Sequence, residues 1–200
     1  MKKLLILTLL LFSIAIQAQT WEAYVKIKRV HDGDGTYYGI TENQDTVTIR
    51  LRNVDCPEIF SPYVLKTQPY GIEAGNQVRS LIKGKTVYAV CFGKSFNRYV
   101  CDITYYEDTL LTKPKDLRTT ILKNGWGWYD GKKYGMKIPS GSKFRGGLKM
   151  VREARKNCLG LWKYSHPIRP SIWRKTERLN KKQKGVPLRL EGKKPKEEVF

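Results

Sequence analysis

The chain of 200 residues has few side chains that bind soft metal ions. Its two histidines and four cysteines are His31, His166, Cys56, Cys91, Cys101 and Cys158. None of the cysteines forms a Cys-x-x-Cys pair, and no histidine stands at a ligand spacing from them, which excludes a zinc site of the usual kind. Each histidine is therefore interpreted as a surface residue or one with its hydrogen bonds satisfied.

Acidic residues are also scarce, because 18 Asp and Glu stand against 38 Lys and Arg, for a net charge of +20. This balance predicts a polyanionic partner, with nucleic acid the first candidate and anionic lipid or polysaccharide the second. Hydrophobic residues make up 40% and aromatic residues 12% of the chain. That composition excludes global disorder and predicts one domain of ordinary size with tails.

Long hydrophobic runs are missing except at the N-terminus, where residues 4–16 are almost entirely apolar behind two lysines. The run is short for a bilayer span and is followed by small residues, which predicts a signal peptide over residues 1–18, cleaved after Ala18. An uncleaved N-terminal anchor is the alternative. A cleaved signal places the mature chain outside the cytoplasm, secreted or periplasmic, where Cys91 and Cys101 either pair across a hairpin or stay as buried thiols.

Hydrophobic periodicity predicts strands over residues 24–30, 36–41, 46–54, 86–92 and 99–106 and helices over 71–82, 114–123 and 148–158. Residues 126–147 are expected to form a loop. This order indicates a small antiparallel barrel with helices beside it, in one domain over residues 19–163. Residues 164–200 are rich in lysine and arginine and are expected to form a basic tail, docked in part through Ile172 and Trp173.

Four carboxylates gather where two neighbouring strands are expected to end: Asp32, Asp34, Asp55 and Glu58. Carboxylates brought this close repel one another unless a cation lies among them, and oxygen ligands favour Ca²⁺ or Mg²⁺. The alternative is that the Asp-Gly-Asp segment is only a turn.

Arginines accompany these acids, with Arg50 and Arg52 on the expected third strand and Arg98 on a hairpin. Guanidinium groups beside a metal ion stabilise the charge that develops on phosphorus oxygens during phosphodiester cleavage. Glu58, with its longer side chain beyond the turn, suits the activation of the attacking water. The alternative is that Arg50 and Arg52 form structural salt bridges with nearby acids.

Aromatic and basic residues alternate in the segment expected to form the long loop: Trp126, Trp128, Tyr129, Lys132, Lys133 and Tyr134. Such a cluster can stack on bases while its lysines meet phosphates. The alternative is that Trp126 and Trp128 close the hydrophobic core.

The order of these motifs resembles the staphylococcal nuclease (thermonuclease) family between Tyr24 and Trp162. The pieces that carry the resemblance are Val30, Asp32, Gly33 and Asp34; Arg50, Asp55, Pro57 and Glu58; Tyr70, Gly71, Glu73 and Ala74; Phe96, Asn97 and Arg98; and the Glu153-Ala154-Arg155 and Gly160-Leu161-Trp162 segments. The resemblance implies an α+β fold of the OB type, a five-stranded antiparallel β-barrel with three α-helices.

The resemblance also implies a role for each matching residue. Asp34, Asp55 and the backbone carbonyl of Cys56 would bind Ca²⁺ directly, and Asp32 would act through water. Glu58 would be the general base, Arg50 and Arg98 would bind the phosphate, and Phe96 would contact the substrate. Tyr129, from the aromatic and basic cluster, is expected to contact the substrate as well. The implied activity is endonucleolytic cleavage of DNA and RNA, with little sequence preference and with 3′-phosphates left behind. We expect a monomer with no stable protein partner and no transmembrane segment in the mature chain.

The chain departs from the family pattern at three places. Gly35 stands between Asp34 and Thr36, where the family has Thr directly after the Asp-Gly-Asp, so the second strand is expected to shift or the Asp34 turn to loosen. Phe96 and Asn97 replace Tyr and Gly before Arg98. Two other functions therefore stay open: a non-catalytic barrel that binds single-stranded nucleic acid, and a cell-surface protein attached to polyanions by its tail.

Overall fold

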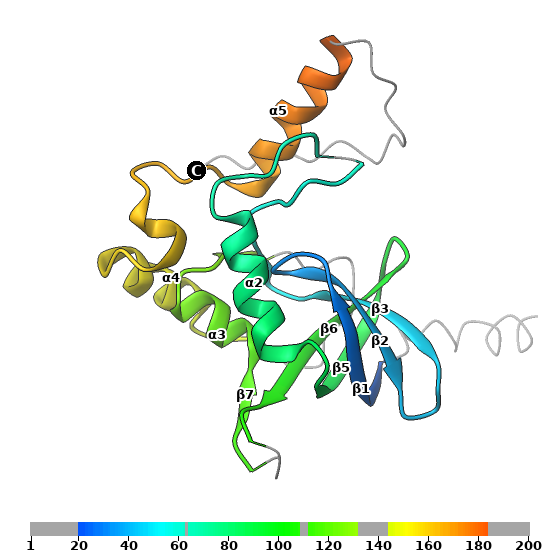
Figure 1. Cartoon of the computed structure of the whole chain (residues 1–200). Helices are drawn as coiled ribbons and strands as arrows, with labels where there is room; N and C mark the ends of the chain where they lie inside the picture. Colours follow the sequence, from blue (N-terminus) through cyan, green and yellow to red (C-terminus); the bar gives the residue numbers. More distant parts are fainter. Residues whose placement is uncertain (1–19, 63, 109–111, 132–143, 184–200) are drawn as a thin grey trace, which may run out of the picture.

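Figure 1 shows the computed structural model of the chain, which describes residues 20–62, 64–108, 112–131 and 144–183. The expected signal peptide lies outside the described residues, as do Lys132, Lys133 and Tyr134 of the aromatic and basic cluster. Within the described parts, no helix combines the length and the apolar character needed to cross a membrane.

Five strands form a closed barrel, as predicted: β1 (Trp21–Val30), β2 (Gly35–Thr41), β3 (Thr46–Leu51), β5 (Thr86–Ser95) and β6 (Arg98–Tyr106). Their order is β3-β2-β1-β5-β6, and a further pairing of β3 with β6 closes the barrel. The closing pair is parallel, whereas the other neighbours are antiparallel. A barrel has no free edge between its strands, so residues at the ends of β3 and β6 are held side by side.

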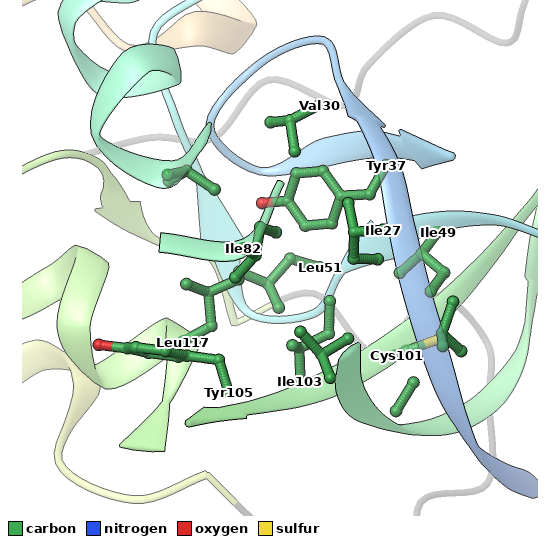
Figure 2. Close-up of a cluster of buried hydrophobic side chains, with 14 of the residues drawn as sticks. Ile27, Val30, Tyr37, Ile49, Leu51, Ile82, Cys101, Ile103, Tyr105 and Leu117 are labelled. Carbon is green, nitrogen blue, oxygen red and sulfur yellow. The ribbon is translucent and has the colours of Figure 1, made fainter. Parts of the chain in front are cut away.

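The inside of the barrel is filled by side chains from alternate strand positions, since successive side chains point to opposite faces. Val47, Ile49 and Leu51 of β3 are buried, which confirms the predicted inward face of that strand. Figure 2 shows Ile27, Tyr37, Ile49, Leu51 and Ile103 meeting in this core, with Ile82 and Leu117 approaching from helices.

Cys91 and Cys101 form a disulfide within the core, at directly opposed positions of β5 and β6. The structure thus selects the disulfide over two free thiols. Cys56, which is buried, and Cys158, which is exposed, are free cysteines.

Three helices lie near the predicted positions: α2 (Gly71–Ile82), α3 (Leu117–Lys123) and α4 (Gly147–Lys156). The prediction that the second helix begins at Pro114 is wrong, because Pro114–Asp116 pairs with β6 as strand β7. Asp116 then caps α3 by accepting a hydrogen bond from the backbone N–H of Thr119 at 2.9 Å. A short 3-10 helix, η2 (Gly160–Lys163), follows α4.

The predicted third strand is broken into β3 and a two-residue strand, β4 (Val54–Asp55), which pairs with β8 (Trp128–Tyr129). The break occurs at Asn53, whose backbone φ of 63° is incompatible with a continuing strand. The expectation of a loop over residues 126–147 is therefore wrong for β8. Trp128 is buried against Trp162, with ring centroids 5.5 Å apart, so the core alternative holds for this tryptophan.

A fourth α-helix, α5 (Pro170–Gln183), lies in the segment expected to be a basic tail. It lies beside the segment that leads from β4 to α2 (Figure 1). The indole N–H of Trp173 donates to the backbone carbonyl of Lys66 at 3.0 Å, and the side-chain amide of Gln68 donates to the carbonyl of Ile168. These two contacts join residues 100 and 107 positions apart in the chain.

Candidate active site

The Asp-Gly-Asp turn between β1 and β2 holds two carboxylates against the barrel end. The Oδ1 atom of Asp32 accepts a hydrogen bond from the backbone N–H of Gly35 at 2.8 Å, and Asp34 is buried. Gly33 packs directly on Cys56, since a Cβ at Gly33 would lie 2.8 Å from the Cys56 sulfur. The turn therefore packs directly on the buried Cys56, and only glycine fits at position 33.

The extra residue, Gly35, is absorbed by a β-bulge. Gly35 lies opposite Arg50 and the next pair joins Tyr37 to Ile49, so Thr36 is the unpaired residue and takes a φ of 64°. The bulge leaves the Asp34 turn attached to β3, because the carbonyl of Asp34 accepts from the N–H of Leu51 at 2.8 Å. Beyond the bulge, β2 pairs with β3 without interruption, from Tyr37 opposite Ile49 to Ile40 opposite Thr46. The shift in pairing is therefore confined to one residue.

Arg50 on β3 lies between two of the acids. Its Nη2 atom is 3.2 Å from Oδ2 of Asp34 and 3.8 Å from Oδ1 of Asp55. Both aspartates are buried, at 6% and 5% exposure. Asp34 reaches this point from the turn after β1, and Asp55 from β4, so the pairing of β4 with β8 is part of what positions the site.

Arg98, the first residue of β6, joins the same cluster. Its Nη1 atom donates to the hydroxyl of Thr36 at 3.1 Å. A Cβ at Gly35 would lie 3.3 Å from this nitrogen and 3.3 Å from Cγ of Arg50. The glycine that departs from the family pattern thus leaves space for the two arginines to approach each other.

Arg52 was expected on the same strand as Arg50, but its guanidinium does not join the acids around Arg50. The chain leaves β3 at Leu51, and Arg52 turns to Asp102, to which its Nε donates at 2.7 Å. Its guanidinium lies 4.5 Å from the centre of the Phe92 ring. Arg52 is 2% exposed and is a structural residue, as the salt-bridge alternative allowed, although its partner is not one of the expected acids.

Glu58 lies beyond β4 and is held by its backbone. Its N–H donates to Oε1 of Gln68 at 3.1 Å, and its carbonyl accepts from the N–H of Gln68 at 2.8 Å. Gln68 is 3% exposed and also bonds Ile168 ahead of α5. Sequence reasoning missed this glutamine, since no motif marks a residue that acts through backbone contacts.

Arg174 of α5 is a further residue that sequence reasoning missed. Its Nη1 atom lies 3.5 Å from Oδ1 of Asp55 and forms an ion pair with Oε1 of Glu58. The available signal was its place directly after Trp173, one of the two residues through which the tail was expected to dock.

Burial and mutual repulsion make these carboxyl groups hold their protons more tightly than usual. Burial, followed by the charges of Asp34 and Glu58, raises the pKa of Asp32 well above its ordinary value. Burial also raises the pKa of Asp34, against the opposing effect of Arg50. Burial raises the pKa of Glu58 to about 7, although Arg174 works in the other direction. A site of this kind gains free energy when positive charge enters it.

The donor set fits a hard divalent cation. All the acids offer oxygen, and Oδ1 of Asp55 is a buried atom with no hydrogen-bond partner among the described residues. In the described part of the chain, no three acidic, histidine or cysteine side chains yet converge as a ready metal cage. The guanidinium groups of Arg50 and Arg174 are the positive groups beside Asp55. The thiol of Cys56 is no ligand here, since burial raises its pKa well above the ordinary value.

The two residues expected to contact substrate differ in their surroundings. Phe96 is 81% exposed at the turn between β5 and β6, two residues before Arg98. Tyr129 is half-buried, with its ring 6.3 Å from that of Phe144, and it packs on Gly147. The exposed ring is available for stacking, whereas Tyr129 contributes to packing between β8 and α4.

Comparison with known proteins gives consistent matches. A family model described as staphylococcal nuclease homologue matches residues 48–164. The chain is 26% identical over 180 residues to an uncharacterized endonuclease of Haemophilus influenzae, covering 90% of this chain and 89% of the relative. It is 27% identical over 175 residues to an uncharacterized endonuclease of Escherichia coli, covering 87% and 98%. A probable staphylococcal-like nuclease of Oryza sativa, CAN3, is 34% identical over 131 residues, covering 65% of this chain and 29% of the relative.

Proposed function

Because the chain belongs to the family of staphylococcal nuclease homologues, we propose that it is a Ca²⁺-dependent endonuclease that hydrolyses phosphodiester bonds in DNA and RNA. The observation that carries the proposal is the meeting of Arg50 and Arg98 with the buried Asp34 and Asp55 at one end of the barrel. Acids alone would suggest a cation site, and arginines alone an anion site. Together they suit a cation and a phosphodiester at once.

Three of the four acidic residues would bind the ion, directly or through water, and the fourth, Glu58, would act as the base. Asp34, Asp55 and the backbone carbonyl of Cys56 would hold the ion, with Asp32 acting through a bound water. The bound ion supplies charge that offsets the negative phosphate and favours ionisation of water. Asp34 and Asp55 are already buried, so little freedom remains to be lost when they bind it.

Glu58 would take the proton from the attacking water. A base works best when its pKa lies near the working pH, and burial raises the pKa of Glu58 from its ordinary value toward that range. Water then attacks phosphorus, the bond to the 5′ oxygen breaks, and this leaving oxygen takes up a proton from solvent. The products are a 3′-phosphate and a free 5′-hydroxyl.

Arg50 and Arg98 would donate hydrogen bonds to the phosphate oxygens. The charge on these oxygens grows in the transition state, so donors that are already in place lower the barrier without reorganising. Phe96, exposed beside Arg98, would stack on a base of the bound strand. Stacking of this kind is tolerant of sequence, which agrees with cleavage of both DNA and RNA.

We further propose that the mature protein acts outside the cytoplasm, after removal of residues 1–18. The disulfide between Cys91 and Cys101 supports this location, because structural disulfides persist in oxidising compartments. A test is N-terminal sequencing of the protein recovered from the extracytoplasmic fraction of its host. A mature terminus at Gln19 is expected, and an intact Met1 there would contradict cleavage.

The activity is tested with labelled single-stranded DNA and RNA, in Ca²⁺ and in chelator. We expect cleavage only with the ion, and a fall in kcat of about 10²-fold or more for Glu58→Gln and Arg98→Ala. Glu42→Gln and Arg152→Ala remove the same charges at exposed positions and serve as matched controls. Unchanged digestion by Glu58→Gln or Arg98→Ala would contradict the assigned roles.

The same assay separates the two other functions. Binding of single strands without any ion-dependent product would favour a non-catalytic barrel. Attachment to anionic polymers that depends wholly on residues 164–200, with no cleavage, would favour a surface-bound protein. The ion pairs of Arg50 with Asp34 and Asp55, and the position of Arg98 beside them, support the enzyme.

A further inference from the structure

The C-terminal helix α5 forms part of the wall around the acidic site. Three contacts hold it there: Trp173 to the carbonyl of Lys66, Gln68 to the carbonyl of Ile168, and Arg174 to Asp55 and Glu58. The first two involve backbone carbonyls and do not depend on the charge of the site. The helix is therefore attached independently of the ion pair that Arg174 makes.

Gln68 couples this helix to Glu58. Its side chain accepts from the N–H of Glu58 and donates to the carbonyl of Ile168. The buried side-chain amide of Gln68 thus bonds both the backbone of Glu58, the expected base, and the backbone of Ile168, just before α5. The position of Arg174 relative to Glu58 is therefore built into the fold rather than left to a loose tail.

The side chain of Arg174 is more exposed than those of the two acids it contacts. It is 27% exposed, against 8% for Asp55 and 17% for Glu58. A nucleic acid strand that reaches these carboxylates from solvent can therefore also reach Arg174. The Oδ1 atom of Asp55 lies 3.5 Å from Nη1 of Arg174 and 3.8 Å from Nη2 of Arg50, so both guanidinium groups border the same carboxylate oxygen.

Charge balance favours a phosphate as the partner of this arginine. Four ionised carboxylates with Arg50, Arg98 and a divalent ion leave a neutral site. Adding Arg174 gives one net positive charge, which matches the single negative charge of a phosphodiester. A guanidinium stays protonated at all working pH values and presents a planar set of donors suited to phosphate oxygens.

We propose that Arg174 is a third phosphate-binding residue, delivered to the site by α5. This rests on the proposed nuclease function. In the substrate complex the guanidinium of Arg174 would pair with a phosphate oxygen in place of Glu58, and Glu58 would then accept the proton from water. Residues 170–183 are then part of the catalytic unit, although the sequence assigns them to a tail.

The test compares Arg174→Gln and Arg174→Lys with Lys175→Ala, which removes one charge from the exposed neighbouring position. Each full-length protein is assayed for cleavage of a single-stranded DNA 12-mer. Binding of thymidine 3′-monophosphate is titrated separately in Ca²⁺. Ca²⁺ binding alone and the melting temperature are measured on the same samples.

We expect Arg174→Gln to lower kcat/KM about 10²-fold and to weaken thymidine 3′-monophosphate binding about tenfold, with Arg174→Lys in between. Lys175→Ala should stay within about threefold of the unchanged protein. Ca²⁺ should bind Arg174→Gln at least as tightly, because one competing cation has left Asp55. The melting temperature should stay close to that of the parent, because the contacts of Trp173 and Gln68 remain.

Two results would overturn the inference. Unchanged cleavage and nucleotide binding by Arg174→Gln would mean that the arginine only fastens the helix. Faster cleavage would mean that the helix obstructs the site. If the parent protein fails to cut at all, the nuclease proposal fails, but the nucleotide titration still reports whether Arg174 binds phosphate.

Discussion

Replacing Glu58 with glutamine should stabilise the metal-free protein above neutral pH while it lowers kcat about 10²-fold or more. Burial raises the pKa of Glu58 from 4.5 to about 7, despite the neighbouring Arg174. The folded protein therefore keeps this proton at a pH where the unfolded chain has lost it. Glutamine has the shape of the protonated acid and carries no charge to desolvate.

The sign follows from proton counting. Between about pH 4.5 and pH 7 the native state binds one more proton than the unfolded state, so the contribution of Glu58 to stability falls as the pH rises. Below that window the acid and the glutamine are equivalent. Above it the difference in unfolding free energy is complete and amounts to about 3.5 kcal/mol at most, since one pKa unit corresponds to about 1.4 kcal/mol. For a chain of this size, that free energy corresponds to about 7–14 °C in melting temperature.

The assay is guanidinium chloride unfolding, followed by tryptophan fluorescence in chelator, at pH 4.5, 6 and 8. Glu58→Gln should match the parent at pH 4.5 and exceed it at pH 8, and the control Glu42→Gln should match it throughout. A gain of the same size at every pH would mean that the effect is not titration. No gain at pH 8 would refute the claim that Glu58 is destabilised by its burial.

Three further outcomes are expected. Asp102→Asn should cost about 3–5 kcal/mol in guanidinium chloride unfolding, because it leaves the guanidinium of Arg52, 2% exposed, without its carboxylate; a loss below 1 kcal/mol would contradict this. Gly35→Ala should lower kcat/KM about tenfold or more with little loss of stability, because its Cβ would lie 3.3 Å from atoms of Arg50 and Arg98, which are proposed to bind phosphate. Full activity of this variant would show that the two arginine side chains can move aside. Replacing Cys91 and Cys101 together by alanine should cost about 2.5 kcal/mol of unfolding free energy, because their link closes a loop of 10 residues, and should leave cleavage intact.

The barrel could be predicted from the sequence because its signal is local and repeated. Alternation of apolar residues marks each strand, and the buried Val47, Ile49 and Leu51 follow it. The break between β3 and β4 could not be predicted in this way. It depends on Asn53, whose side-chain amide donates to the carbonyl of Asp130 at 3.1 Å, a contact between residues 77 positions apart.

The acids of the site were predictable, whereas their surroundings were only partly so. Asp34, Asp55 and Glu58 lie at turns that follow strands, and turn residues can be read from the sequence. The resemblance assigned the phosphate role to Arg50, but the partner of Arg52 could not be predicted, because it depends on β3 ending at Leu51 and on Asp102, 50 positions away. Arg174 could not be predicted, since nothing local ties a basic residue in the C-terminal segment to acids more than 110 positions earlier.

Barrel closure brings together Arg50 and Arg98, the two arginines proposed to bind phosphate. The parallel contact between β3 and β6 sets Ile49 opposite Tyr99 and Arg50 opposite Val100, so Arg98 enters β6 just beside the strand that carries Arg50. Gly35 lies between these two arginines, beside the bulge at Thr36, and a side chain there would meet Cγ of Arg50 and the guanidinium of Arg98. An acid cluster on an open sheet would repel itself and attract cations without discrimination. Closing the sheet brings fixed positive charge to the same point, and that combination turns a cation site into one that can also hold a phosphodiester.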